Sequence, residues 1–90
     1  MSRIIVAEDS PTQAEQIRFL LEEYGHQVDV AGNGRAALQA IAGKVPDLVL
    51  TDLEMPEMNG LELVEAVRRD FPTVPVILMT AHGKIGRAHV

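Results

Sequence analysis

The sequence contains no cysteine and no tryptophan, and its aromatic residues amount to two phenylalanines and one tyrosine. Without cysteine, the chain can form neither a disulfide nor a metal site with thiolate ligands. So few aromatic side chains provide no stacking platform for nucleic-acid bases. Apolar runs long enough to span a bilayer are also absent, and the first residues enter a strand-like segment without a signal-peptide pattern. Together, these absences predict a cytoplasmic protein without a membrane segment.

The 90 residues are enough for one domain, and 47% hydrophobic with 23% charged residues is an ordinary mixture for a globular protein. The net charge of −5 argues against a general nucleic-acid-binding surface. We therefore expect a single domain that does not bind nucleic acid directly.

Four short apolar segments are typical of β-strands: residues 4–7, 26–31, 48–51 and 74–79. The first is a continuous apolar run, as expected for a strand buried on both faces. The second alternates between apolar and polar residues and therefore predicts a more exposed strand. Pro75 is tolerable because it lies near the start of its strand.

The first helix is predicted to begin after Ser10, which can cap it, with Pro11 at the first helical position and Gln13 where a capping box needs Glu or Gln. Gly25 can end this helix in a left-handed conformation. The expected apolar stripe consists of Ile17, Leu20, Leu21 and Tyr24.

Two further helices are expected between the later strands. Residues 32–34 indicate a turn, residues 35–42 a short helix, and Gly43 its end. Asn59 and the glycine after it mark another turn, and Asn59 with Glu62 resembles a second capping pair. The third helix carries an apolar stripe of Leu61, Val64 and Val67 and ends at Phe71-Pro72.

Strands that alternate with helices in this way predict an α/β fold, with a parallel sheet covered by helices on both faces. Right-handed crossovers connect nearly all such strands.

Acidic or hydroxyl groups follow three of the predicted strands. Glu8 and Asp9 follow the first strand, Asp52 the third and Thr80 the fourth. Ligands of open parallel sheets bind beyond the carboxyl ends of the strands, so we expect these groups to share one crevice. Crowded carboxylates require compensation, and Mg²⁺ accepts such oxygen ligands. A carboxylate beside Mg²⁺ can attack phosphorus and form an aspartyl phosphate.

Each residue also has an ordinary explanation. Glu8 and Asp9 suit the start of a helix, Asp52 suits a turn, and Thr80 is a common residue at a strand end. It is their joint position at one end of a sheet that favours a site. The histidines have no recognisable metal spacing and are interpreted as surface or loop residues.

The segments "IIVAEDSPTQ", "DLVLTDLEMPEMNG" and "VPVILMTAHG" resemble the receiver domain of two-component response regulators, such as chemotaxis regulators. The resemblance covers about residues 3–83 and implies a flavodoxin-like sheet with the strand order 2-1-3-4 for the strands present.

The resemblance also implies roles for individual residues. Asp52 matches the phosphoacceptor, and Glu8 and Asp9 match the acidic pair that holds Mg²⁺ or Mn²⁺. Asp52 and the backbone carbonyl of Glu54 would be further metal ligands. The hydroxyl of Thr80 and the backbone N–H of Ala81 would contact the phosphoryl group. The implied donor is a phosphohistidine on a histidine kinase or phosphotransfer protein, and such a domain is not a stand-alone enzyme.

The match predicts a truncated receiver domain over residues 1–83 and a non-matching tail over residues 84–90, which we interpret as non-native. We find no fifth strand with its terminal lysine and none of the last helices, and Lys84 is a poor substitute because Gly86 follows it. The fourth strand would then form an open edge and one sheet face would lose its cover. We expect impaired signalling and a homodimer or higher oligomer.

The sequence is compatible with three functions. The first is a phosphoacceptor module of a phosphorelay. The second is a receiver fragment that cannot signal and whose main property is self-association, by domain swapping or edge pairing. The third is a flavodoxin-like domain that binds a nucleotide or flavin, which the acidic residues after the first strand disfavour because a Gly-rich phosphate loop belongs there.

Overall fold

The computed structural model of this protein describes residues 2–79, which form strands and helices in the predicted alternating order. The elements are β1 (Arg3–Ala7), α1 (Pro11–Glu23), β2 (Gln27–Ala31), α2 (Gly34–Gly43), β3 (Leu48–Asp52), α3 (Gly60–Asp70) and β4 (Val76–Met79). Thr80, Ala81 and the predicted tail lie outside the described residues, and so does the predicted domain boundary after residue 83.

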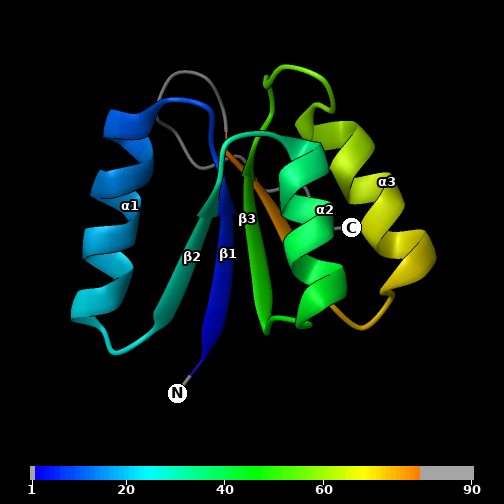
Figure 1. The fold of residues 1–90 in the computed structure, drawn as a ribbon. Coiled ribbons are helices and arrows are strands. Elements are labelled where there is room, and N and C mark those ends of the chain that lie inside the picture. The colour runs from blue at the N-terminus through cyan, green and yellow to red at the C-terminus, as the bar shows by residue number, and fades with distance from the viewer. Residues whose placement is uncertain (1, 80–90) are drawn as a thin grey trace.

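The strands form one parallel sheet in the order β2-β1-β3-β4, which confirms the predicted flavodoxin-like arrangement. Helix α1 covers one face of the sheet, and α2 and α3 cover the other (Figure 1). Ala7 at the end of β1 lies opposite Ala31 of β2 and Thr51 of β3, and Asp52 lies opposite Met79 of β4. The carboxyl ends of all the strands therefore meet at one edge.

Successive residues of β1 point to opposite faces of the sheet, so this strand contributes to two apolar cores. On the side of α2 and α3, Ile5 packs among buried residues that include Ile41 and Leu63. On the side of α1, Ile4 and Val6 pack with Val28. Burial on both faces explains why β1 is a continuous apolar run.

The predicted Ser10 cap and Pro11 start of α1 are confirmed, but the capping box with Gln13 does not form, because the Ser10 N–H donates to Glu8 Oε2 instead. The predicted apolar stripe is also partly wrong. The Ser10 side chain accepts a hydrogen bond from the N–H of Gln13 at 3.4 Å, and Gly25 follows the helix with φ of +87°. Leu20 and Tyr24, however, are 53% and 76% exposed. Leu20 lies at the margin of the stripe and Tyr24 is the C-cap residue, where the chain leaves the helix. The face that meets the sheet consists of Ala14, Ile17 and Leu21.

Helix α3 shows a similar correction. Asn59 and Glu62 form the predicted capping box, with each side chain accepting a hydrogen bond from the other residue's backbone N–H at 2.9 and 3.0 Å. Leu61 is 54% exposed, whereas Leu63 is fully buried beside Val64 and Val67. Position 61 falls in the first turn of the helix, on the side away from the sheet.

Strand β4 begins at Val76, two residues later than predicted, because the N–H of Val74 donates to the carbonyl oxygen of Phe71 in a turn. Within residues 2–79, no helix combines the length and the apolar character needed to cross a membrane.

Candidate functional site

The candidate site lies at the carboxyl ends of β1 and β3. Glu8 directly follows β1, and its N–H donates to the carbonyl oxygen of Ala31 at 2.9 Å, which fixes the chain as it leaves the sheet. Asp52 is the last residue of β3. Since Ala7 lies opposite Thr51 in neighbouring strands, the residues that follow them, Glu8 and Asp52, come to the same level.

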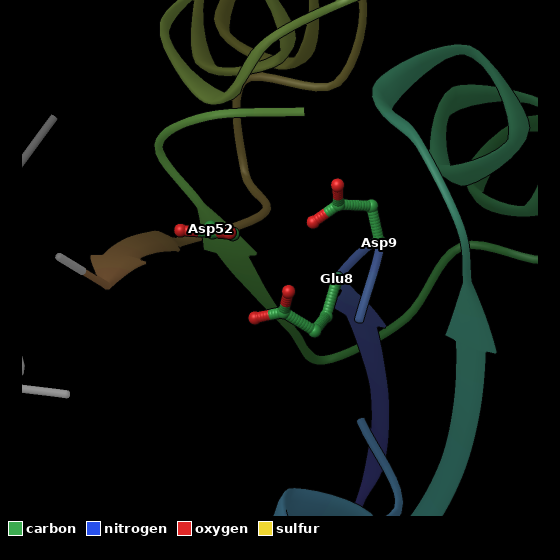
Figure 2. A group of neighbouring side chains, drawn as sticks. All are labelled: Glu8, Asp9 and Asp52. Carbon is green, nitrogen blue, oxygen red and sulfur yellow. The ribbon is translucent and has the colours of Figure 1, made fainter. Parts of the chain in front are cut away.

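The structure brings together the three acidic residues that the sequence placed in one crevice. One potential ligand atom from each of Glu8, Asp9 and Asp52 lies within 4.8 Å of the other two. Figure 2 shows Glu8 and Asp9 leaving the end of β1 beside Asp52 at the end of β3. Glu8 is only 4% exposed, Asp52 is half-buried and Asp9 is exposed. The cluster is thus accessible from solvent at Asp9 and closed at Glu8.

Burial raises the pKa of the Glu8 carboxyl above its ordinary value of 4.5, and the charges of Asp52 and Asp9 raise it further. The N–H of Ser10 acts in the opposite direction, since it donates to Glu8 Oε2 at 3.0 Å and stabilises the carboxylate. None of the ion pairs found within residues 2–79 involves Glu8, Asp9 or Asp52. A bound cation would compensate the charges of these three carboxylates best. Their oxygen atoms are the kind of ligand that Mg²⁺ prefers.

Two buried residues beside the cluster were not identified from the sequence. Thr51 is fully buried within β3, and its hydroxyl donates to the carbonyl oxygen of Asp52 at 2.9 Å. A Cβ atom on Gly60 would lie 2.2 Å from the same carbonyl oxygen. The sequence signal at Gly60 was the Asn-Gly pair, which was interpreted only as a turn; the close approach depends on tertiary packing.

The described residues leave the roles of the remaining predicted site residues untested. Glu54 lies in the loop after Asp52 with an exposed side chain, and the role of its backbone carbonyl as a metal ligand stays a prediction. Thr80 and Ala81 lie outside the described residues, so their contacts with a phosphoryl group stay predictions too.

Comparison with known families gives one match over nearly the whole chain. The family model described as the response regulator receiver domain matches residues 4–89. The predicted boundary after residue 83 is not tested by this match.

Several proteins have sequences similar to that of this chain. The luminescence regulatory protein LuxO of Vibrio campbellii is 39% identical over 83 residues, which cover 92% of this chain and 18% of LuxO. Protein PilH of Pseudomonas aeruginosa is 38% identical over 82 residues, covering 89% of this chain and 68% of PilH. The chain therefore spans less than a fifth of the first relative and about two thirds of the second.

Solved structures of other proteins have the same fold as this chain. The response regulator protein TrrA from Thermotoga maritima, in complex with Mg²⁺ and BeF, has a TM-score of 0.87 and 38% identity, over 90% of this chain and 70% of TrrA. A response regulator receiver domain protein from Clostridium thermocellum has a TM-score of 0.86 and 30% identity, over 92% of this chain and 68% of that one.

Proposed function

This chain belongs to the response regulator receiver domain family, and on that premise we propose that it is the phosphoacceptor module of a two-component phosphorelay. Asp52 accepts a phosphoryl group, in a reaction that depends on Mg²⁺ or Mn²⁺, from a phosphohistidine of a histidine kinase or phosphotransfer protein. The observation that carries this proposal is the clustering of Glu8, Asp9 and Asp52 at the ends of neighbouring parallel strands. The domain is a phosphoacceptor, not a stand-alone enzyme.

Asp52 is the nucleophile. One of its carboxylate oxygens forms a bond to phosphorus while the bond between phosphorus and the histidine nitrogen breaks, and that nitrogen keeps the electron pair and takes up a proton. Its position as the last residue of β3, paired with Met79 of β4, holds the Asp52 backbone at the edge of the sheet where the acidic cluster lies.

Glu8 and Asp9, which follow the neighbouring strand β1, would hold the metal together with Asp52. Bound Mg²⁺ would neutralise the charge that develops on the phosphoryl oxygens. Glu8 is buried and anchored to the N–H of Ser10, so it offers a fixed carboxylate, whereas the exposed Asp9 is free to bind through water. The Glu54 carbonyl is proposed as a further ligand, and Thr80 and Ala81 as donors to the phosphoryl oxygens.

The test is phosphorylation by a small phosphodonor, acetyl phosphate, with Mg²⁺. We expect the mass to rise by one phosphoryl group in the wild type and not in Asp52→Asn. Asp70→Asn is the matched control, because Asp70 is an exposed aspartate at the far end of α3. Chelation of the metal should abolish the reaction. Equal modification of the wild type and Asp52→Asn would contradict the assignment of the phosphoacceptor.

A second candidate function is self-association, and the surface beside β4 favours it. Within the described residues, β4 pairs with β3 on one side, while its other edge has no neighbouring strand. Leu50 of β3 and Ile77 of β4 are only partly buried. Edge pairing or strand exchange between two copies would satisfy the open backbone groups and cover these side chains. A sedimentation experiment that finds a folded monomer at micromolar concentration would contradict this candidate.

We further propose that the protein is cytoplasmic and that this domain does not bind nucleic acid directly.

A further inference from the structure

We propose that Gly34, at the first position of α2, is a positioning residue for the metal site. It holds the loop of residues 53–59, called here the β3–α3 loop, in the shape that presents the proposed Glu54 carbonyl ligand. This inference rests on the proposed function, because it concerns the same metal site. The juxtaposition that carries it is the contact between the start of α2 and Met58 in this loop.

Gly34 lies so close to Met58 that a residue with a side chain has no room at this position. Its N–H donates to the carbonyl oxygen of Met58 at 3.0 Å, and Gly34 is buried. A Cβ atom at position 34 would lie 2.3 Å from that carbonyl oxygen and 2.8 Å from the Met58 Cγ atom. The side chain of Met58 can rotate away, but its carbonyl oxygen cannot move unless the loop backbone moves with it.

The glycine is not needed for the helix itself. Asn33 already caps α2, since its side-chain oxygen accepts a hydrogen bond from the N–H of Ala36 at 2.8 Å. Among the glycines of residues 2–79, a positive φ occurs at Gly25, not at Gly34. The close approach to Met58 is therefore the requirement that this position meets.

The first residues of α2 contact the loop at a second point, Glu57. This residue has a φ of +67°, which is unusual for a side chain other than glycine. Asn33 Nδ2 donates to Glu57 Oε2 at 3.5 Å, and Arg35 Nε lies 3.8 Å from Glu57 Oε1. All three side chains are at least partly exposed, so these contacts add little to the stability of the fold. They do, however, involve Glu57, the residue whose backbone is strained.

The other end of the loop is fixed on the sheet. The N–H of Gly60 donates to the carbonyl oxygen of Leu53 at 2.9 Å, and the N–H of Leu53 donates to that of Met79 at 3.2 Å. The loop therefore leaves β3 directly after Asp52 and is fixed to the sheet at one end and to α2 near the other. A displacement of Met58 can be absorbed only in the short segments between these fixed points, which are residues 54–57 on one side and Asn59 on the other.

Metal coordination is sensitive to such displacements, because Mg²⁺ demands near-ideal octahedral geometry. Groups outside the coordination sphere that orient a ligand typically contribute about 10- to 100-fold to metal affinity. Gly34 would act in this way through the backbone of Met58, without touching the metal.

The experiment compares Mg²⁺ binding by Gly34→Ala and Gly43→Ala, measured by isothermal titration calorimetry at a temperature where both variants are folded. Both changes add one methyl group to an end of α2, but a Cβ atom on Gly43 meets nothing within 4 Å. We expect the dissociation constant to rise about tenfold in Gly34→Ala and less than about twofold in Gly43→Ala. A purely structural role would lower the melting temperature of Gly34→Ala and leave the Mg²⁺ affinity of its folded state unchanged.

A second measurement uses the wild type, so it does not depend on the folding of a variant. Since coupling is reciprocal, Mg²⁺ must stabilise the contact between Gly34 and Met58 if that contact favours Mg²⁺ binding. We expect Mg²⁺ to slow amide hydrogen exchange at Gly34 more than at Lys44, whose N–H donates to Ala40 at the opposite end of α2.

The outcomes separate the two proposals. If the wild type binds Mg²⁺ but the affinities of the two variants agree and the two amides respond equally, the positioning role is overturned and the proposed function stands. If the wild type does not bind Mg²⁺, the proposed function fails, and the positioning role fails with it.

Discussion

Glu8 and Asp52 stand at the ends of neighbouring parallel strands with potential ligand oxygens no more than 4.8 Å apart, and Glu8 is almost completely buried. Two carboxylates so placed repel each other, and burial of Glu8 adds a desolvation cost to its ionised form. The metal-free site therefore opposes the stability of the fold at neutral pH. A divalent cation reverses the sign of this electrostatic interaction.

The pH dependence of stability should reveal this arrangement. Because the folded-state pKa of Glu8 is raised above its ordinary value of 4.5, the folded protein binds more protons than the unfolded chain. Stability is then lost as pH rises from the ordinary carboxyl range through the raised pKa. We expect Glu8→Gln without metal to have a higher melting temperature than the wild type at pH 7, with a difference that shrinks toward pH 4.

The amide oxygen that Glu8→Gln introduces can still accept the hydrogen bond from the N–H of Ser10, so this comparison isolates the charge. Glu23→Gln serves as a control, because Glu23 is an exposed glutamate at the end of α1 that takes part in none of the ion pairs found within residues 2–79. A Glu8→Gln variant that melts below the wild type at pH 7 would contradict the raised pKa.

Removal of metal provides the converse prediction. At a Mg²⁺ concentration about 100 times its dissociation constant, binding should stabilise the folded state by about 2.7 kcal/mol. Excess chelator should return the melting temperature to the metal-free value, and Asp9→Asn should weaken the effect. Thermal unfolding in NaCl of equal ionic strength is the control, and an equal rise there would mean that screening, not a bound ion, is responsible.

Gly60→Ala should be strongly destabilising. Its Cβ atom would lie 2.2 Å from the carbonyl oxygen of Asp52 and 3.0 Å from Leu53 Cα, which are backbone atoms that cannot rotate away. We expect a loss of about 2 kcal/mol or more in the free energy of unfolding, measured with urea. Gly32→Ala, where a Cβ atom meets nothing within 4 Å, should change stability far less. Equal effects would show that the loop backbone can yield.

Helix α3 offers a matched pair for the apolar core. Leu63 is fully buried against the sheet, and Leu61, two residues earlier, is 54% exposed. Leu63→Ala should lower the free energy of unfolding by about 2–5 kcal/mol, because it leaves a cavity. Leu61→Ala should stay within about 0.5 kcal/mol of the wild type. Similar losses for the two variants in urea unfolding would place Leu61 in the core after all.

Much of the fold followed from local features of the sequence. The continuous apolar run of β1, the caps at Ser10 and Asn59, and the glycine after α1 each have a local physical cause, and the structure confirms them. The acidic cluster was also predictable, because parallel strands bring their carboxyl ends to one edge whatever their side chains are. The strand order 2-1-3-4 came from the family resemblance.

Other features were settled only when the elements packed together. Periodicity included Leu20 and Leu61 in apolar stripes, yet both are exposed, because the orientation of each helix against the sheet decides which margin of a stripe is buried. Gly34 and Gly60 looked like turn residues. Only the packed structure shows that the backbone of Met58, for Gly34, and of Asp52 and Leu53, for Gly60, occupies the space of their missing side chains. The sequence by itself determined the order of the elements and the caps of α1 and α3, through local backbone and side-chain preferences. The tertiary structure decided which of those residues touch, because such contacts depend on the relative placement of segments far apart in the chain.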